Sequence, residues 1–194
     1  MSTSPLRLAV VVGSTREGRF GPTVARWFVG QAQLRPDMHV DLIDLIDVDL
    51  PSAYPASASP AVEAFARRID EADAVVVVTP EYNHGYPAAL KQAIDLLRAE
   101  WRAKPVGFVS YGGMSGGLRA VEQLRQVFPE LGAMTVRNSV SFHNVWPLFD
   151  ETGQPRDPAG CNAAAAGMLD QLAWWGQPLR TARAADALVM REAS

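Results

Sequence analysis

Residues 74–97 read AVVVVTPEYNHGYPAALKQAIDLL, an apolar run followed by a turn and then by an amphipathic segment. The run at 74–78 is apolar on both faces, which is typical of a strand that is covered on both sides of a sheet. The segment after the turn has apolar residues at helical spacing, at Leu90, Ala93, Ile94 and Leu97. A buried strand that leads directly into a helix predicts one βα unit of a parallel sheet.

The same alternation of strand and helix recurs along the rest of the chain. Further strands are predicted at 6–12, 40–45, 106–109 and 134–140. Helices with one apolar face are predicted around 24–32, 62–69, 118–128 and 165–175. This order of elements predicts an α/β fold, a doubly wound, five-stranded parallel sheet with helices on both faces.

The length of 194 residues suits one domain, and no internal repeat or shift in composition divides the chain. We expect a single domain over 1–194, with a core at about 6–176 and a polar C-terminal tail at 177–194 that is loosely held. Trp174 and Trp175, just before that tail, are expected to pack in the core or at a seam between subunits.

The charge balance gives a net charge of −3, and no long block of like charge is present. We therefore expect neither a nucleic-acid partner nor a membrane partner. The N-terminal apolar run is too short for a signal peptide, and a cytoplasmic location is expected. The one cysteine, Cys161, cannot form an internal disulfide, which fits a reducing compartment. It is either a nucleophile or, as the burial of free cysteines favours, a half-buried residue before a helix.

Unusual residues follow three of the predicted strands. These loops are GSTREGRFGPT at 13–23, PEYNHGYP at 80–87 and YGGMSGG at 111–117. In a doubly wound sheet, ligands bind outside the carboxyl ends of the strands, where the strand order reverses. We therefore expect the three loops to meet at one rim of the sheet and to form one site.

The first loop has the composition of a phosphate site. It offers hydroxyl groups, two arginine side chains and the backbone N–H groups of a helix start. It lacks both the G-x-G-x-x-G pattern of a dinucleotide site and the G-K-[ST] of a Walker loop. The alternative is a capped helix with two solvated arginines. Asp44, after the second strand, is only a weak candidate for the acid that a dinucleotide ribose requires.

The other two loops predict walls for a flat ring. Tyr82 and Tyr86 can lie against a ring, while the glycines of 111–117 allow main-chain N–H groups to approach a ligand edge. His84 is either a general acid or base or, as its lack of a neighbouring carboxylate favours, a wall residue. One anion site between two such walls suits a flat cofactor with a single phosphate, and flavin mononucleotide (FMN) is the candidate.

Three stretches carry a resemblance to a known family: GSTREGRFGPTVARWF, TPEYNHGYPAALKQAIDLL and KPVGFVSYGGMSGG. They resemble the signature stretches of the NADPH-dependent FMN reductase family, a flavodoxin-like group that includes small quinone, azo-dye and chromate reductases. The resemblance extends from about Leu6 to Trp175. It implies the flavodoxin-like strand order 2-1-3-4-5 and a homodimer or homotetramer.

The resemblance also implies the cofactor-binding residues. Ser14 and Arg16 match phosphate-binding positions, and Arg19 stands where many members have a serine, so that it would supply a charge in place of a hydroxyl. The residues that would surround the flavin are Ser14, Arg16, Arg19, Phe20, Gly21, Pro22, Thr23, Pro80, Glu81, Tyr82, Asn83, Gly112, Gly113 and Ser115.

The implied activity is an FMN-dependent NAD(P)H oxidoreductase. NADPH or NADH would reduce the flavin, and the flavin would pass two electrons to a small acceptor such as a quinone, an azo compound, free flavin or a metal oxyanion. The cofactor supplies this chemistry, so no side chain is predicted as a catalytic residue and no metal site is predicted. The alternative is a non-catalytic, flavin-dependent redox-sensing protein that reports to a partner. For the donor's extra phosphate, Arg98, Arg102 and Arg119 are candidates, although a solvated surface arginine is the favoured interpretation of each.

The long loop SFHNVWPLFDETGQPRDP at 141–158 contains three aromatic residues, Phe142, Trp146 and Phe149. Long loops in compact domains are often functional. Two hypotheses stay open: the aromatic side chains cover a flavin in a partner subunit, or they close the open end of their own core.

Overall fold

The computed structural model describes residues 4–51 and 53–185. Its five strands are β1 (Leu6–Val12), β2 (Met38–Asp44), β3 (Ala74–Pro80), β4 (Pro105–Tyr111) and β5 (Met134–Phe142). All neighbours pair in parallel, in the order β2-β1-β3-β4-β5. The predicted fold and strand order are confirmed, although β2 starts earlier than predicted and β5 runs two residues further.

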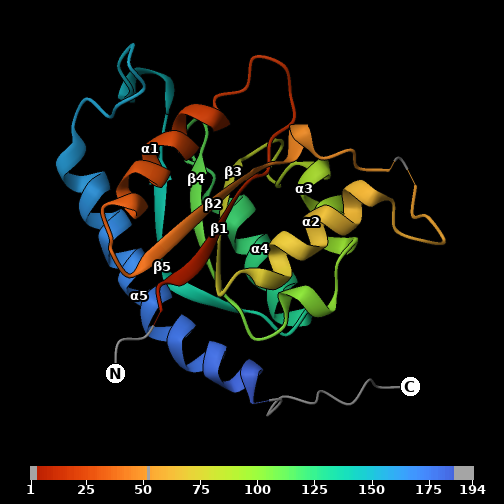
Figure 1. Cartoon of the computed structure of the whole chain (residues 1–194). Helices are drawn as coiled ribbons and strands as arrows, with labels where there is room; N and C mark the ends of the chain where they lie inside the picture. The colour runs from red at the N-terminus through yellow and green to blue at the C-terminus, as the bar shows by residue number, and fades with distance from the viewer. Residues whose placement is uncertain (1–3, 52, 186–194) are drawn as a thin grey trace.

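Helices cover both faces of the sheet. They are α1 (Gly21–Gln33), α2 (Pro60–Glu71), α3 (Ala88–Asp95), α4 (Leu118–Glu130) and α5 (Pro158–Ala184), with short 3-10 helices at η1 (Leu45–Asp47), η2 (Ala99–Trp101) and η3 (Trp146–Leu148). In Figure 1, α1 and α5 lie on one side of the sheet and α2, α3 and α4 on the other. The loop after β1 is the red segment at the top of the view.

The alternation of side chains along the buried strands divides the core into two halves. Val76 and Val78 of β3 pack with residues of α1 and α5, whereas Val75 and Val77 pack with residues of α2, α3 and α4. Successive side chains of a strand point to opposite faces, so an unbroken apolar run fills both cores at once. This is the physical reason why the run at 74–78 predicts the fold.

A bulge interrupts the pairing of β5 with β4. Val106 pairs with Thr135 but Phe108 pairs with Ser139, so that β5 has two more residues than β4 over this stretch. The backbone groups released by the bulge bond to side chains of the flanking helices: Arg125 donates to the carbonyls of Val136 and Arg137, and Gln171 accepts from the N–H of Asn138. These bonds satisfy polar groups that would otherwise be left without a partner.

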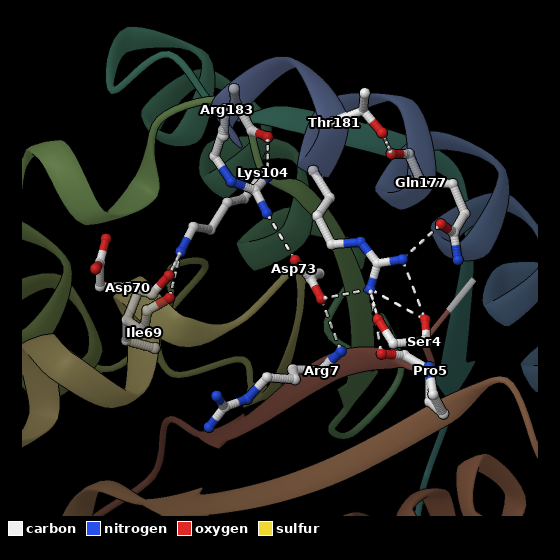
Figure 2. Close-up of polar contacts among 12 residues, drawn as sticks. Ser4, Pro5, Arg7, Ile69, Asp70, Asp73, Lys104, Gln177, Thr181 and Arg183 are labelled. Atoms are coloured by element: carbon white, nitrogen blue, oxygen red, sulfur yellow. Dashed lines mark hydrogen bonds and ion pairs between the residues drawn. The ribbon is translucent and has the colours of Figure 1, made fainter. Parts of the chain in front are cut away.

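The prediction of a loosely held tail from Gln177 is wrong for the part that the structure describes, because α5 continues to Ala184. Two arginines of its last turns bond to Asp73, just before β3: Arg183 Nη2 lies 2.9 Å from Oδ1 and Arg180 Nη1 lies 3.5 Å from Oδ2. Oδ2 also accepts from the N–H of Arg7 at 3.0 Å. Figure 2 shows how Asp73 joins α5 to the amino ends of β1 and β3. Residues 186–194 of the predicted tail lie outside the described residues.

A buried lysine lies beside this cluster. Lys104, just before β4, donates from Nζ to the carbonyl of Ile69 at 2.5 Å and to that of Asp70 at 2.6 Å, at the end of α2 (Figure 2). Burial, together with the charge of Arg183, lowers the pKa of Lys104 to about 8. The ammonium group therefore binds the last carbonyls of a helix at the expense of its own hydration.

Trp174 and Trp175 do not pack in the core. Both side chains are exposed on α5 and contact each other edge to face, with ring centroids 4.7 Å apart. The prediction of core packing is wrong, and their place at a subunit seam stays a prediction. Among the described residues, no helix is both long and apolar enough to cross a membrane.

Candidate functional site

The three predicted loops meet at the carboxyl ends of β1, β3 and β4 and enclose a cleft of about 600 Å³. This volume is within the range of pockets that bind small ligands and cofactors. The lining residues are Arg16, Glu17, Gly18, Arg19, Phe20, Pro80, Glu81, Tyr82, Asn83, Tyr111, Gly112, Gly113, Val145 and Trp146.

The part of the loop after β1 that lines the cleft, residues 16–20, has unused backbone donors. None of the N–H groups from Ser14 to Gly21 donates to an acceptor in the described part of the chain. Gly18 has a φ of +67°, which turns the loop back toward α1. Successive free N–H groups at the start of a helix favour an anion, and a phosphate group is their natural ligand.

The two arginines of this loop differ in their partners. Arg19 donates two hydrogen bonds to the carboxylate of Asp44 and a third to the carbonyl of Ser14 at 2.7 Å. The paired hydrogen bonds with Asp44 raise the pKa of Arg19. Arg16 makes no ion pair with any described residue, and its guanidinium lies 5.8 Å from the centroid of the Tyr82 ring. Arg16 is therefore the uncompensated cation of the cleft, whereas Arg19 braces the loop instead of supplying a free charge.

Ser14 lies beneath the cleft rather than in its wall. Its exposed fraction is 0%, and its hydroxyl accepts from the Tyr111 hydroxyl at 3.2 Å. Burial raises the pKa of Tyr111, so that this hydroxyl stays a donor. Gly21 closes over the pair, since a Cβ at this position would lie 2.5 Å from Ser14 Oγ and 2.7 Å from Tyr111 Oη. The pair fixes the base of the phosphate loop, and Asp44, bonded to Arg19, is not free to bind a ribose.

The PEYN turn forms the second wall. The N–H of Tyr82 donates to the carbonyl of Gly85 at 2.9 Å, and the N–H of Gly85 donates back to Tyr82 at 3.0 Å. Asn83 and His84, between them, have φ values of +50° and +70°, which few side chains adopt. This tight turn directs the Tyr82 ring toward Arg16 and explains why the sequence needs an amide and an imidazole at the tip.

Glu81 joins the second wall to the third. Its carboxylate accepts from the N–H of Arg119 at 3.2 Å and from Nε of the same residue at 2.6 Å, and its side chain is only 5% exposed. Burial alone would raise the pKa of Glu81, but hydrogen bonds from Ser115 and Arg119 lower it below its ordinary value. Arg119 also lies 2.8 Å from Nε2 of His84. Glu81 therefore links the PEYN turn to Ser115 and Arg119 of the third wall. Because Arg119 is bonded to Glu81, it is not available for the extra phosphate of NADPH.

The loop after β5 completes the cleft. Phe142 and Phe149 are buried against Trp27, which confirms that these two aromatics close their own core. Trp146 instead lines the cleft of its own chain, with Val145. Part of the 141–158 loop thus belongs to the site.

The structure brings most of the predicted residues together and separates a few. Arg16, Arg19, Phe20, Pro80, Glu81, Tyr82, Asn83, Gly112 and Gly113 line the cleft. Ser14, Gly21, Pro22, Thr23 and Ser115 do not line it. Sequence reasoning missed Glu17, Gly18, Tyr111 and Val145, although the first three lie within or next to the loops that it selected. Cys161 lies in the first turn of α5, not before the helix, and burial raises its pKa, which disfavours a nucleophilic thiolate.

These residues fit a flavin mononucleotide. The free N–H groups of 16–20 and the guanidinium of Arg16 suit one phosphate, and because the charge of Arg19 is compensated, the described lining offers no second strong anion site beside them. A Cβ at Gly113 would meet no atom within 4 Å, so its backbone faces open space in the cleft wall. A planar ring can therefore lie against the PEYN turn and Gly112–Gly113, which line the same cleft.

The fold and the cleft define a flavodoxin-like protein with a site for a flat, singly phosphorylated nucleotide. The chain belongs to the NADPH-dependent FMN reductase family, whose model matches residues 6–147. The family predicted from the three loops is confirmed.

Individual relatives agree with this assignment. The chain is 36% identical over 142 residues to a quinone reductase of Escherichia coli, covering 68% of this chain and 73% of that protein. It is 36% identical over 130 residues to an NAD(P)H-dependent FMN reductase of Schizosaccharomyces pombe, and the match covers 62% of this chain and 64% of that protein.

Solved structures share the fold. FerB, a flavoenzyme NAD(P)H:(acceptor) oxidoreductase from Paracoccus denitrificans, superposes with a TM-score of 0.71 at 23% identity, covering 89% of this chain and 98% of that one. A short-chain flavodoxin superposes with a TM-score of 0.56 at 18% identity, covering 86% and 99%.

Proposed function

We propose that the protein is an FMN-dependent NAD(P)H oxidoreductase that reduces a small acceptor, with quinones as the first class to test. The observation that carries the proposal is the cleft that is lined together by residues 16–20, with their free N–H groups and the Arg16 guanidinium, by the PEYN turn and by Gly112–Gly113. The names of the relatives in E. coli and S. pombe support the same activity.

The protein's own groups supply binding and electrostatics. The N–H groups of 16–20 and Arg16 would bind the phosphate, and the PEYN turn with Gly112–Gly113 would hold the ring. When bound, FMN supplies two-electron transfer between NAD(P)H and the acceptor. The backbone N–H groups of the PEYN turn and of Gly112–Gly113 would stabilise negative charge on the reduced cofactor. The balanced reaction with a quinone converts NAD(P)H, a proton and the quinone to NAD(P)⁺ and the hydroquinone.

The test is an anaerobic mixture of the flavin-loaded protein with NADPH or NADH. Rapid bleaching of the flavin absorbance, followed by its return when a quinone is added, supports the enzyme. Mass analysis of the released cofactor separates FMN from FAD. A protein that binds FMN but is reduced by neither donor would be the redox-sensing alternative, and a protein that binds no flavin would contradict both.

We also propose a cytoplasmic homodimer or homotetramer. The exposed edge-to-face pair of Trp174 and Trp175 on α5 supports association, since tryptophan is enriched at subunit interfaces. Light scattering of the purified protein, compared with a Trp174→Ala variant, tests the assembly, and cell fractionation tests the location.

A further inference from the structure

Trp146 lines the cleft from a backbone segment that is fixed on both sides by hydrogen bonds and packing. The N–H of Asn144 donates to the carbonyl of Gly113 at 2.8 Å, and the N–H of Val145 donates to that of Gly112 at 3.0 Å. Val145 is fully buried in the core beside α1 and α5. The segment before Trp146 is therefore bonded directly to the loop that forms the third wall.

The segment after Trp146 is anchored as firmly. Phe149 is buried, with its ring centroid 5.5 Å from Phe20 and 5.0 Å from Phe142. The N–H of Arg156 donates to the carbonyl of Leu148 at 2.8 Å, which closes the loop on itself. Backbone bonds and aromatic packing on both sides thus hold the position of Trp146.

The side chain of Trp146 itself is largely exposed to solvent. Trp146 is 63% exposed and lines both the main cleft and an adjoining hollow of about 310 Å³, which it shares with Phe20. A tryptophan on a fixed backbone has only two side-chain torsions, so a flat ligand that stacks on it costs little conformational entropy. Of the described aromatic residues that line the cleft, Tyr111 is buried, Phe20 and Tyr82 are half-buried, and only Trp146 is mostly exposed.

We propose that Trp146 is a specificity-determining residue that stacks against planar electron acceptors, namely quinones. The proposal rests on the proposed function, since the acceptor must approach the cofactor in this cleft. In the reaction the quinone gains two electrons and two protons to become the hydroquinone. NAD(P)H provides the hydride equivalent through the bound flavin, and solvent provides the second proton.

Steady-state kinetics of the flavin-loaded protein provide the test, with 1,4-naphthoquinone as the planar acceptor and ferricyanide as an acceptor that cannot stack. Trp146→Ala is expected to lower kcat/KM for the quinone about tenfold, while Trp146→Phe, which keeps an aromatic face, loses about threefold or less. The ferricyanide rate and the Kd for FMN should stay at the wild-type values in both variants. Tyr54→Ala is the control, an exposed aromatic residue outside the cleft, and should change the rate with neither acceptor.

A binding measurement separates this proposal from the proposed function. Titration of the flavin-loaded protein with the quinone should quench tryptophan fluorescence less in Trp146→Phe than in the wild type. That result would support the stacking role even if neither nicotinamide donor reduced the flavin. Equal quenching in both proteins, an equal loss with both acceptors, or a loss of FMN affinity in Trp146→Ala would each overturn the assignment to the acceptor.

Discussion

Arg19 and Asp44 form a two-pronged ion pair behind the phosphate loop, with Nη1 to Oδ1 at 2.7 Å and Nη2 to Oδ2 at 2.8 Å. Both side chains are largely buried, so the pair is shielded from solvent and compensates its own charge. Arg19 therefore stabilises the loop, whereas Arg16 remains available for a ligand. The sequence, which shows only two arginines in one loop, does not reveal this difference.

This division predicts different salt dependences for the two arginine variants. Arg16→Ala should raise the Kd for FMN about tenfold or more at low salt and flatten its dependence on ionic strength, because an uncompensated cation is removed. Arg19→Ala should also weaken binding, through a loosened loop, but leave the salt slope near that of the wild type. Flavin fluorescence titrations over a range of salt concentrations measure both. If both variants flattened the dependence of the Kd on salt equally, Arg19 would have to leave Asp44 and bind the phosphate itself.

Two glycines of α1 provide a matched pair for the base of the loop. Gly21→Ala places a Cβ against Ser14 Oγ and Tyr111 Oη and should lower the free energy of unfolding by about 1–3 kcal/mol, with weaker FMN binding. Gly30→Ala, in the same helix with no atom within 4 Å of its Cβ, should stabilise the protein by up to about 1 kcal/mol. Urea unfolding of both variants is the measurement, and a neutral Gly21→Ala would contradict the proposed close contact.

The carboxylate of Glu81 predicts a link between wall spacing and cofactor retention. Glu81→Gln keeps the size of the side chain but loses its ion pair with Arg119, and we expect FMN to dissociate about tenfold faster. Stopped-flow fluorescence measures the rate. Because the pKa of Glu81 is lowered in the fold, its stabilising contribution is present above the ordinary carboxyl pKa and is lost as the pH falls through the folded value. The wild type should therefore lose FMN faster only at acidic pH. If Glu81→Gln released FMN at the wild-type rate, the ion pair between Glu81 and Arg119 would have no role in retaining the cofactor.

Asp73 predicts a large loss of stability far from the cleft. Its carboxylate accepts hydrogen bonds from Arg180, Arg183 and the N–H of Arg7. Asp73→Asn should lower the free energy of unfolding by about 3 kcal/mol, because two partly buried guanidinium groups lose their anionic partner. Glu71→Gln breaks an ion pair whose side chains are both more than half exposed and should cost less than about 1 kcal/mol. Chemical unfolding tests the pair. Similar losses would mean that the last turns of α5 contribute little to stability.

Lys104 predicts a rise of stability in the alkaline range. Its pKa of about 8 in the folded protein lies below its ordinary value of 10.5, so the folded state binds fewer protons than the unfolded state between these two values. The free energy of unfolding should therefore increase with pH in this window, by at most about 1.4 kcal/mol per pH unit from this residue. Lys104→Met should remove this component, and the difference between wild type and variant at several alkaline pH values isolates it from other titrating groups. A pH-independent difference would place the folded pKa outside the window.

The sequence predicts the architecture because the run at 74–78 and its counterparts leave few alternatives to a parallel sheet, and the loops at strand ends then meet at one rim. It could not predict the end of α5, because Arg180 and Arg183 find their partner Asp73 more than 100 positions away along the chain. The polarity of that segment is the same whether its arginines are solvated or bonded to a buried carboxylate.

The same limit applies within the site. Ser14 and Arg19 have the residue types of a phosphate site, but Tyr111 and Asp44 occupy their side chains, and both partners come from other strands. Trp146 was visible as one aromatic residue of a long loop, yet only the bonds to Gly112 and Gly113 show that the loop turns back over its own cleft. Pairings distant in sequence decide which polar side chains remain available for a ligand.

The bulge in β5 has a consequence for how copies of the chain can meet. An outermost strand with regular, vacant ladder groups invites a neighbouring strand to dock, which is a route to fibrils and to uncontrolled association. Here Arg125 and Gln171 already occupy groups of that strand at the bulge, so a continuous intermolecular ladder would have to break them. The β5 edge is thus disfavoured as a place for strand-to-strand association between copies of the chain.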